Sequence, residues 1–325
     1  MNINLNDNFT ITTEAYDIGE RADVFAVSAI STSRPELNLT RSAVQRLIEN
    51  GDILINDNVI KSNYKIRGND VMSVSLPAPA ELDIPAENIP LEIVYENNGM
   101  LIINKPRGIV VHPAPGHYTG TIVNALMFHF GSELSGINGA LRPGIIHRLD
   151  MDTSGVLAIA KNDFFHQSLS LQLATREMSR KYKTLLHGNI KDDEGEISNF
   201  MGRNPHDRKK MAVLSPSDRS ESKRSATTRY RVISRLFYKN KSYTFIEASL
   251  VTGRTHQIRV HMAHIGHPVV GDVVYGIPAP SGFPRLEGQL LHAETIGFTH
   301  PETGEKMSFS APIPNDFSRI IEIIS

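Results

Sequence analysis

The sequence predicts an α+β protein with two domains. Segments in which apolar and polar residues alternate, as in strands, are interspersed with segments that have the three- to four-residue spacing of amphipathic helices. A chain of 325 residues with 40% hydrophobic residues can form two packed domains, or one large domain with an appendage. Residues 77–90, PAPAELDIPAENIP, hold four prolines, which restrict the backbone and favour an extended linker. We therefore expect a tail at 1–15, a first domain at 16–78, a linker at 79–90 and a second domain at 91–325.

The first domain has clear helix and hairpin signals. Thr40 is placed to cap a helix with apolar residues at 43, 44, 47 and 48, and Gly51 is placed to end it. The segment DILINDNVIKS then predicts two strands joined by a turn at Asp57-Asn58. Residues 1–15 lack periodicity, which is typical of a tail or an edge strand.

A helix with a basic polar face followed by a hairpin resembles the S4 RNA-binding domain. The segment RADVFA at 21–26 keeps the arginine, aspartate and phenylalanine of the helix that usually opens such domains, but lacks the leucine and lysine. The resemblance implies RNA contacts, which we assign here to Arg41, Arg46, Lys61 and Lys65. The alternative is a small α+β appendage that packs on the second domain or on a partner protein.

The second domain contains several predicted strands and helices. Alternation predicts strands around the Asn97–Gly99 turn, at 179–187, at 243–250, and around a Thr303-Gly304 turn. Helices are expected after the cap at Asn162 and from Thr255 to Ile265. Residues 198–228 have few apolar residues and are expected to form a loop or a flexible hairpin. Residues 203–235 hold ten Lys and Arg against three acids, which suits phosphate contacts, assigned to Arg208, Lys209 and Lys210, or a solvated surface.

The polar loop inside GIIHRLDMDTSGVLAIAK, residues 144–161, carries the densest chemistry in the chain. Apolar residues at 145–146 and 156–160 flank it as expected buried strands. On residue types alone, Asp150, Asp152 and Ser154 are equally suited to shaping a turn or to catalysis.

Four motifs in the second domain resemble those of the RluA-type pseudouridine synthases, in particular the S4-containing branch. They are HRLDxxTSG, NKPxGxxVHP at 104–113, the segment RKY at 180–182 before Gly188, and GRTHQIRVH at 253–261. The resemblance implies that Asp150 is the catalytic residue, that Arg259 pairs with its carboxylate as a bidentate partner, and that Tyr182 stacks on the base or donates its hydroxyl. It also implies a mixed, mainly antiparallel sheet split by a cleft. Without the resemblance, Tyr182 is a core residue, Arg259 an exposed helical arginine, and Lys105 a solvated lysine in a proline-glycine turn.

The implied reaction isomerises uridine in RNA to pseudouridine. The N1–C1′ bond breaks, the base turns, and a C5–C1′ bond forms. A carboxylate can attack the sugar as a nucleophile or act as a base at it, and the sequence leaves both routes open. A uridine that is stacked in folded RNA does not expose C1′ and C5 to a side chain, so the nucleotide must turn out of the stack. We expect Arg148 to occupy the position that the base leaves. Large-subunit ribosomal RNA is the favoured substrate. Transfer RNA, or a non-catalytic role in RNA binding or ribosome assembly, is the alternative.

Composition narrows the remaining possibilities. The absence of cysteine excludes disulfides and thiolate metal sites. Histidines at 256, 261, 264 and 267 lack the spacing of a known zinc site, and the isomerisation moves no hydride, electron or acyl group, so we expect neither metal nor cofactor.

A polar N-terminus and the lack of a long apolar run predict a cytoplasmic protein with no membrane segment, and we expect a monomer.

Overall fold

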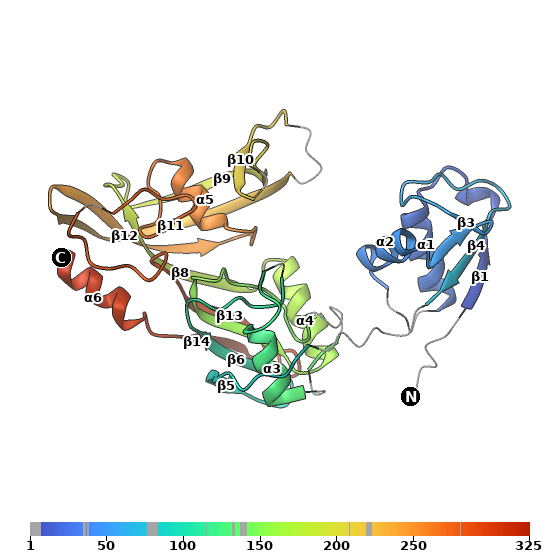
Figure 1. The fold of residues 1–325 in the computed structure, drawn as a ribbon, viewed down its shortest axis with the longest axis horizontal. Coiled ribbons are helices and arrows are strands. Elements are labelled where there is room, and N and C mark those ends of the chain that lie inside the picture. Colours follow the sequence, from blue (N-terminus) through green and yellow to red (C-terminus); the bar gives the residue numbers. More distant parts are fainter. Residues whose placement is uncertain are drawn as a thin grey trace. The chain divides into compact units, whose positions relative to one another are not determined.

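The computed structural model describes residues 8–34, 37, 39–76, 84–114, 116–131, 134–136, 142–207, 209–218, 223–279 and 281–325. The chain divides into two compact units, Met1–Glu81 and Leu82–Ser325, which Figure 1 shows as ribbons. Each unit has its own hydrophobic core. An α+β architecture with a small first domain is therefore confirmed.

The first unit packs two helices, α1 (Ala22–Ser33) and α2 (Arg41–Asn50), on a small antiparallel sheet. The strands are β1 (Asn8–Thr12), β2 (Ile53–Ile55), β3 (Asn58–Val59) and β4 (Val71–Ser75), in the order β1-β4-β2-β3. Helix α2 is capped as predicted, because the Thr40 hydroxyl accepts a hydrogen bond from the backbone N–H of Ala43 and Gly51 has a φ of 82°. The hairpin turn lies at Asn56-Asp57, both with positive φ, one residue before the predicted position.

Two predicted domain boundaries need correction. Residues 8–12 form an edge strand, β1, which was the alternative to a tail, and because β1 pairs antiparallel with β4 the first domain begins before residue 16. The end of the predicted linker, from Ile84 on, belongs to the second unit, because Ile84 is buried in its core and Glu87 donates its backbone N–H to Asn124. The prolines thus predict an extended backbone, but they do not predict whether that backbone packs into the core of a domain.

The second unit is organised on a ten-stranded sheet among the described residues, with the order β10-β9-β11-β12-β8-β13-β7-β6-β5 and β14 paired to β13. Its strands are, in chain order, β5 (Glu92–Glu96), β6 (Met100–Lys105), β7 (Ser154–Ala160), β8 (Ser179–His187), β9 (Glu194–Arg203), β10 (Met211–Leu214), β11 (Arg224–Tyr238), β12 (Lys241–Leu250), β13 (Leu291–Thr299) and β14 (Lys306–Ser310). The pairing of β7 with β13 is parallel and the other described strand pairs are antiparallel. The predicted mixed, mainly antiparallel sheet is confirmed.

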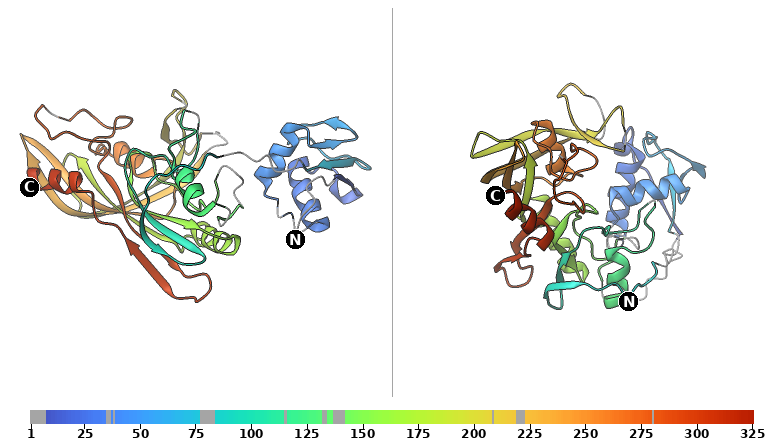
Figure 2. Two further views of the ribbon diagram at one scale, coloured as in Figure 1. Left: turned by 60° about the horizontal axis from the view of Figure 1, so that its bottom comes forward. Right: turned by 60° about the vertical axis from the view of Figure 1, so that its left-hand side comes forward.

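The sheet has two halves that meet at β8. Strands β9–β12 and helix α5 (Gln257–His264) form one half, and β5, β6, β7, β13 and β14 with α3 (Ile122–Phe130) and α4 (Asp163–Ala174) form the other (Figures 1 and 2). Every residue of β7 is buried, as its apolar sequence predicts. Helix α6 (Asn315–Ile324) packs Phe317 and Ile320 against Leu185 and Tyr243.

Two local predictions for this unit were wrong and one was partly right. Residues 145–146 make only an isolated bridge, from Ile145 to Ile159. Within 198–228, β9 and β10 form the hairpin that was one of the two expectations, and strand structure extends further, into the start of β11, because pairing between neighbouring strands outweighs low apolar content. Helix α5 begins at Gln257, after His256 in the left-handed region, and Thr255 does not cap it.

Candidate active site

The loop before β7 is held by contacts to its own strand. The backbone N–H of Thr153 donates to the carbonyl of Asp150, and the backbone N–H of Ala158 donates to Nε2 of His147. Burial, followed by the charge of Arg180, lowers the pKa of His147 to about 3, so the neutral ring with Nε2 as acceptor fits the geometry. Gly155 has a φ of 115°, and a Cβ atom there would lie 2.1 Å from the carbonyl oxygen of Ala293. The loop is therefore rigidly placed by its neighbours.

Lys105, at the end of β6, is buried against this loop and hydrogen-bonds to its backbone. Its side chain is 0% exposed, and Nζ donates to the carbonyls of Pro106, Ile109 and Met151 at 2.7, 2.9 and 2.9 Å. Burial lowers its pKa to about 7, although the charges of Asp152 and Asp150 oppose that shift. Lys105 is therefore not a solvated lysine, the alternative that the turn sequence left open. Its hydrogen bond to Met151 connects the NKP segment to the residue after Asp150.

Asp150 and Arg259 form the predicted ion pair. Nη1 of Arg259, on α5, donates to Oδ2 of Asp150 at 2.8 Å. The carboxylate is 17% exposed and the guanidinium side chain 5%, so little water screens the pair. The positive charge of Arg259 stabilises the negative charge of the carboxylate, which is the form that either chemical route requires.

The bidentate partner of Arg259 is Asp272 rather than Asp150. Nε and Nη2 of Arg259 donate to the two carboxylate oxygens of Asp272 at 2.7 and 2.9 Å. Asp272 also accepts the backbone N–H groups of Val274 and Tyr275. Burial by itself would raise the pKa of Asp272, but Arg259 and these N–H groups outweigh it and lower the pKa. The predicted bidentate geometry towards Asp150 was therefore wrong, since Asp150 receives one hydrogen bond.

Sequence reasoning overlooked Asp272, although PVVGDVVYG offers a signal. A carboxylate inside an apolar run is expected to be buried, and a buried carboxylate requires a charged or hydrogen-bonding partner. His256 was considered only as a metal ligand. Its Nδ1 lies 2.8 Å from the Tyr275 hydroxyl and its Nε2 lies 3.8 Å from Oδ1 of Asp150. Burial lowers the pKa of His256, with Asp150 opposing.

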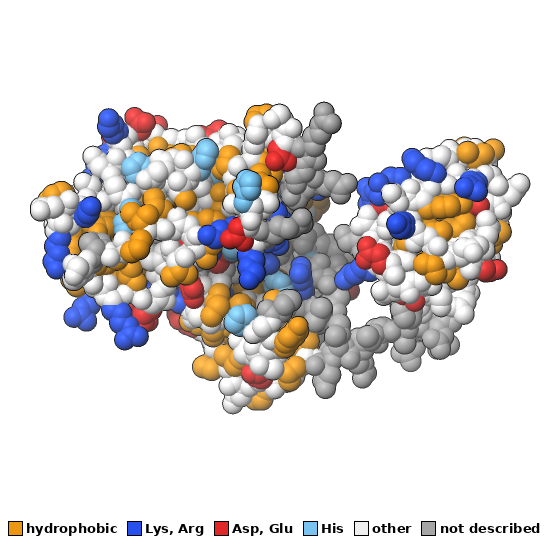
Figure 3. Space-filling model, turned by 45° about the horizontal axis from the view of Figure 1, so that its top comes forward, with side chains coloured by type: hydrophobic (Ala, Val, Ile, Leu, Met, Phe, Trp, Pro, Cys, Tyr) orange, Lys and Arg blue, Asp and Glu red, His pale blue; other side chains and the backbone are white. Residues whose placement is uncertain are grey.

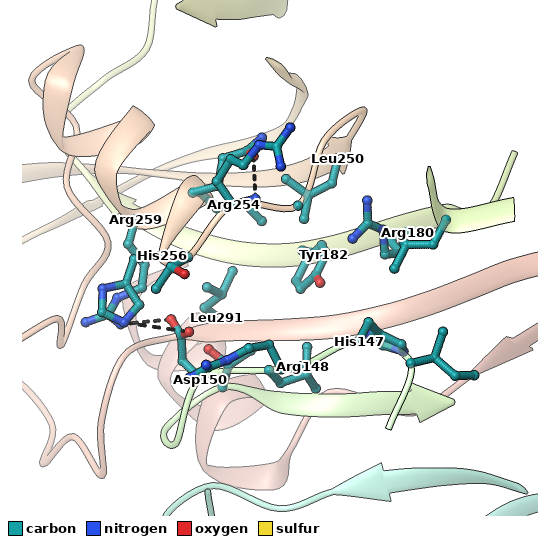
Figure 4. Close-up of a pocket in the computed structure, with 18 residues that line it drawn as sticks. His147, Arg148, Asp150, Arg180, Tyr182, Leu250, Arg254, His256, Arg259 and Leu291 are labelled. Atoms are coloured by element: carbon teal, nitrogen blue, oxygen red, sulfur yellow. Dashed lines mark hydrogen bonds and ion pairs between the residues drawn. The ribbon is translucent and has the colours of Figure 1, made fainter. Parts of the chain in front are cut away.

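A cavity of 260 Å³ opens at Asp150 (Figure 4). Its walls come from both halves of the sheet: the loop before β7, strand β8, and the segment from Gly253 to Arg259. Pockets for drug-sized ligands begin at about 300 Å³, so this one suits a single nucleotide and not a helix. Figure 3 shows Lys and Arg side chains gathered beside a recess in the middle of the second unit.

Tyr182 and Arg148 both line the cavity. Tyr182 is buried on β8 opposite Ala248 and Ala293, whose small side chains leave room for its ring. Burial raises the pKa of its hydroxyl, with Arg180 opposing the shift, so the hydroxyl remains a donor at neutral pH. Arg148 is exposed. The structure thus brings Tyr182 and Arg259 to the loop that carries Arg148 and Asp150, although these three segments are far apart in sequence.

The predicted RNA-binding residues lie outside this cavity. Arg46, Lys61 and Lys65 are exposed on the first unit, whereas Arg41 is half-exposed and donates Nε and Nη2 to the buried Asp23. Lys209 is exposed near β10, Lys210 lies 3.9 Å from Asp207, and Arg208 falls outside the described residues. The structure leaves their contacts with RNA as predictions.

Neither a metal-binding cluster nor a membrane-spanning helix occurs in the described part of the chain. It contains no cluster of three or more histidines or acids that could hold a metal ion. No described helix combines the length and apolar character needed to cross a membrane.

Comparison with known proteins identifies the family. A family model described as RNA pseudouridylate synthase matches residues 99–264, and an S4 domain model matches residues 34–72. The RNA pseudouridine synthase YlyB of Bacillus subtilis is 45% identical over 96% of this chain and 96% of its own. Ribosomal large subunit pseudouridine synthase D of Zymomonas mobilis is 38% identical over 98% of this chain and 97% of its own. The solved structure of human RNA pseudouridylate synthase domain containing 1 has a TM-score of 0.55 and 27% identity, covering 70% of this chain and 85% of the other. The chain therefore belongs to the S4-containing branch of the RluA-type RNA pseudouridine synthases, which are isomerases.

Proposed function

We propose that this enzyme converts specific uridines of large-subunit ribosomal RNA to pseudouridine, with Asp150 as the catalytic carboxylate. The observation that carries the proposal is the position of Asp150 inside the cavity, where Arg259 holds one carboxylate oxygen. Among the described residues, the other oxygen, Oδ1, has a single ion-pair neighbour, Nε2 of His256 at 3.8 Å. One oxygen is thus fixed and the other faces the space in which a ribose can lie.

The chemistry requires a carboxylate at the sugar. Asp150 either attacks C1′ as a nucleophile, so that the N1–C1′ bond breaks as a sugar ester forms, or removes the C2′ proton so that the uracil leaves and a glycal forms. The freed uracil turns so that C5 faces C1′. In the first route C5 then bonds to C1′ as the ester oxygen of Asp150 leaves, and in the second C5 adds to C1′ of the glycal as the proton returns to C2′. In both routes the proton on C5 leaves and N1 takes up a proton. In either route Arg259 places a positive charge 2.8 Å from one oxygen of the Asp150 carboxylate.

The cavity is too small for a helix, so the uridine must leave its stack. Turning out a nucleotide costs about a few kcal/mol. The exposed Arg148, at the edge of the cavity, is placed to occupy the vacated stack, and the Tyr182 ring is placed to pack on the turned-out uracil. Neither Arg148→Ala nor Tyr182→Phe is expected to unfold the protein.

Ribosomal RNA is favoured by the names of relatives in Zymomonas mobilis and Neisseria meningitidis, both ribosomal large subunit pseudouridine synthase D. The S4 unit adds a second surface for RNA, to which we assign the exposed Arg46, Lys61 and Lys65 and the half-exposed Arg41. Lys209 and Lys210 would contact backbone phosphates from the second unit, together with Arg208.

The first experiment compares purified wild-type protein with Asp150→Asn and Asp152→Asn. Large-subunit RNA transcribed in vitro is the substrate, and carbodiimide-blocked primer extension detects pseudouridine. We expect product with wild type and with Asp152→Asn, and none with Asp150→Asn. Wild-type rates from Asp150→Asn would show that another residue performs the catalytic step.

Mapping pseudouridines in cells that lack the gene tests the substrate. Loss of sites in large-subunit ribosomal RNA is the expected result, and loss only in transfer RNA would refute that assignment. Unchanged pseudouridine in all RNA, with RNA affinity retained by the protein, would favour a non-catalytic role.

A further inference from the structure

Arg180 is a buried cation for which the described residues supply no anion. It lies on β8 two residues before Tyr182, lines the same cavity, and is 8% exposed. Its Nε atom is buried without a hydrogen-bond partner, and no carboxylate pairs with its guanidinium among the described residues. Arg259, in the same cavity, is held by two carboxylates. Because an unpaired buried charge is costly, the contrast indicates that the anion for Arg180 is supplied from outside the chain.

A second arginine lies beside Arg180. Arg254 lines the cavity from the loop after β12, and its Nε donates to the carbonyl of Ser225. Burial lowers the pKa of Arg254, and the positive charges of Arg224, Arg176 and Arg180 lower it further. In Figure 4 Arg180 lies on the side of Tyr182 away from Arg259 and Asp150. Among the described residues that line the cavity Asp150 is the only acid, so the charged groups on this side, Arg180 and Arg254, are both positive.

Gly253 makes room for the Arg180 guanidinium. A Cβ atom at Gly253 would lie 2.4 Å from Nη1 of Arg180, well inside contact distance. The guanidinium therefore packs directly on the backbone of the loop that carries Arg254. This packing holds the guanidinium of Arg180 in the cavity wall. Its N–H groups are not hydrogen-bonded to a carboxylate of the described residues.

We propose that Arg180 and Arg254 form a phosphate site that binds a backbone phosphodiester of the RNA next to the turned-out uridine. The inference rests on the proposed function, since it assumes that a nucleotide enters this cavity. Guanidinium groups bind phosphate oxygens through paired hydrogen bonds. An RNA nucleotide whose sugar lies at Asp150 and whose base packs on Tyr182 carries a phosphate on each side of that sugar. Binding one of them stabilises the turned-out state specifically, because a stacked nucleotide leaves its phosphates outside the cavity.

Equilibrium binding measures the phosphate contact directly. Large-subunit RNA transcript is titrated with protein at several KCl concentrations, in an Asp150→Asn background so that the RNA is not converted. Each lost phosphate contact is expected to reduce the slope of log affinity against log salt by about 0.7 to 0.9. Arg180→Met keeps the side-chain volume and removes the charge, and we expect weaker binding with that smaller slope. Arg180→Lys should restore the slope.

The control is Arg319→Met, which removes an exposed arginine of α6 that does not line the cavity. An Arg180→Met protein with the slope and affinity of this control would overturn the phosphate site. Should Arg180→Met fail to fold, Gly253→Ala retains the arginine but displaces its guanidinium. Weaker binding by Gly253→Ala is then expected, and wild-type affinity and slope would overturn the proposal.

The test separates this inference from the proposed function. Pseudouridine formation by the wild type is measured in parallel, and binding does not depend on it. If Arg180→Met has a reduced slope but the wild type forms no pseudouridine, the proposed function is refuted and the phosphate site is supported. Pseudouridine formation with an unchanged slope in Arg180→Met refutes the phosphate site alone.

Discussion

Replacing Asp272 by asparagine tests the arrangement on which the active site depends. Asp272 and Arg259 are 0% and 5% exposed, so the magnitudes for buried ion pairs apply. Asparagine turns one acceptor into an NH₂ group that faces an N–H of Arg259. Breaking a buried pair costs about 3–5 kcal/mol. We expect the lower end, about 3 kcal/mol, because Asp150 still balances part of the charge of Arg259.

The same change should reduce catalysis. Asp272 fixes the guanidinium with two hydrogen bonds, and Arg259 in turn holds Oδ2 of Asp150 with one. A catalytic group displaced by about 1 Å can cost about 100-fold in rate. We therefore expect a loss of roughly that size in single-turnover pseudouridine formation, measured well below the unfolding transition.

Urea unfolding of the wild type and of Asp272→Asn gives the free energy of unfolding. The matched control is Asp193→Asn, which alters an exposed Arg–Asp pair in which Asp193 is 84% exposed, and it should cost less than about 1 kcal/mol. If Asp272→Asn had the stability of this control and the single-turnover rate of the wild type, the reasoning about the buried pair would be refuted.

Three further predictions concern the loop around Asp150. Burial lowers the pKa of Lys105 from 10.5 to about 7, so between these values the unfolded chain binds a proton that the folded chain lacks, and stability rises with pH. In urea unfolding from pH 7.5 to 9.5, the wild type should gain up to about 1.4 kcal/mol per pH unit relative to Lys105→Met, and parallel curves would contradict this. Gly155→Ala should destabilise the protein by more than about 2 kcal/mol, because the positive φ and the Ala293 carbonyl both oppose a methyl group; a smaller loss in thermal unfolding would mean that the strand pair can shift. Arg148→Ala should change stability by less than about 0.5 kcal/mol but lower the single-turnover rate at least tenfold, and an unchanged rate would exclude a role in turning out the base.

Local sequence signals predicted the elements whose stability is local. Thr40 and Gly51 bracket helix α2, and Asn162 caps α4, since a cap needs only the first or last turn of its helix. The apolar run at 156–160 predicted a buried strand correctly. For 198–228 the sequence left a loop and a hairpin equally open, because the strands there are stabilised mainly by pairing with neighbouring strands, and pairing has no local signature in the sequence.

The motifs by themselves determined the reaction class and brought Asp150, Arg148, Tyr182 and Arg259 forward as site residues. Only the tertiary structure decided how those residues are held. Asp272 takes the paired hydrogen bonds of Arg259, Lys105 is buried under the loop, and Arg180 faces the cavity without a carboxylate. The physical reason is that charge pairing and burial depend on which segments the sheet brings together. Arg259 and Asp150 are 109 residues apart, and their contact follows from strand order rather than from any local pattern.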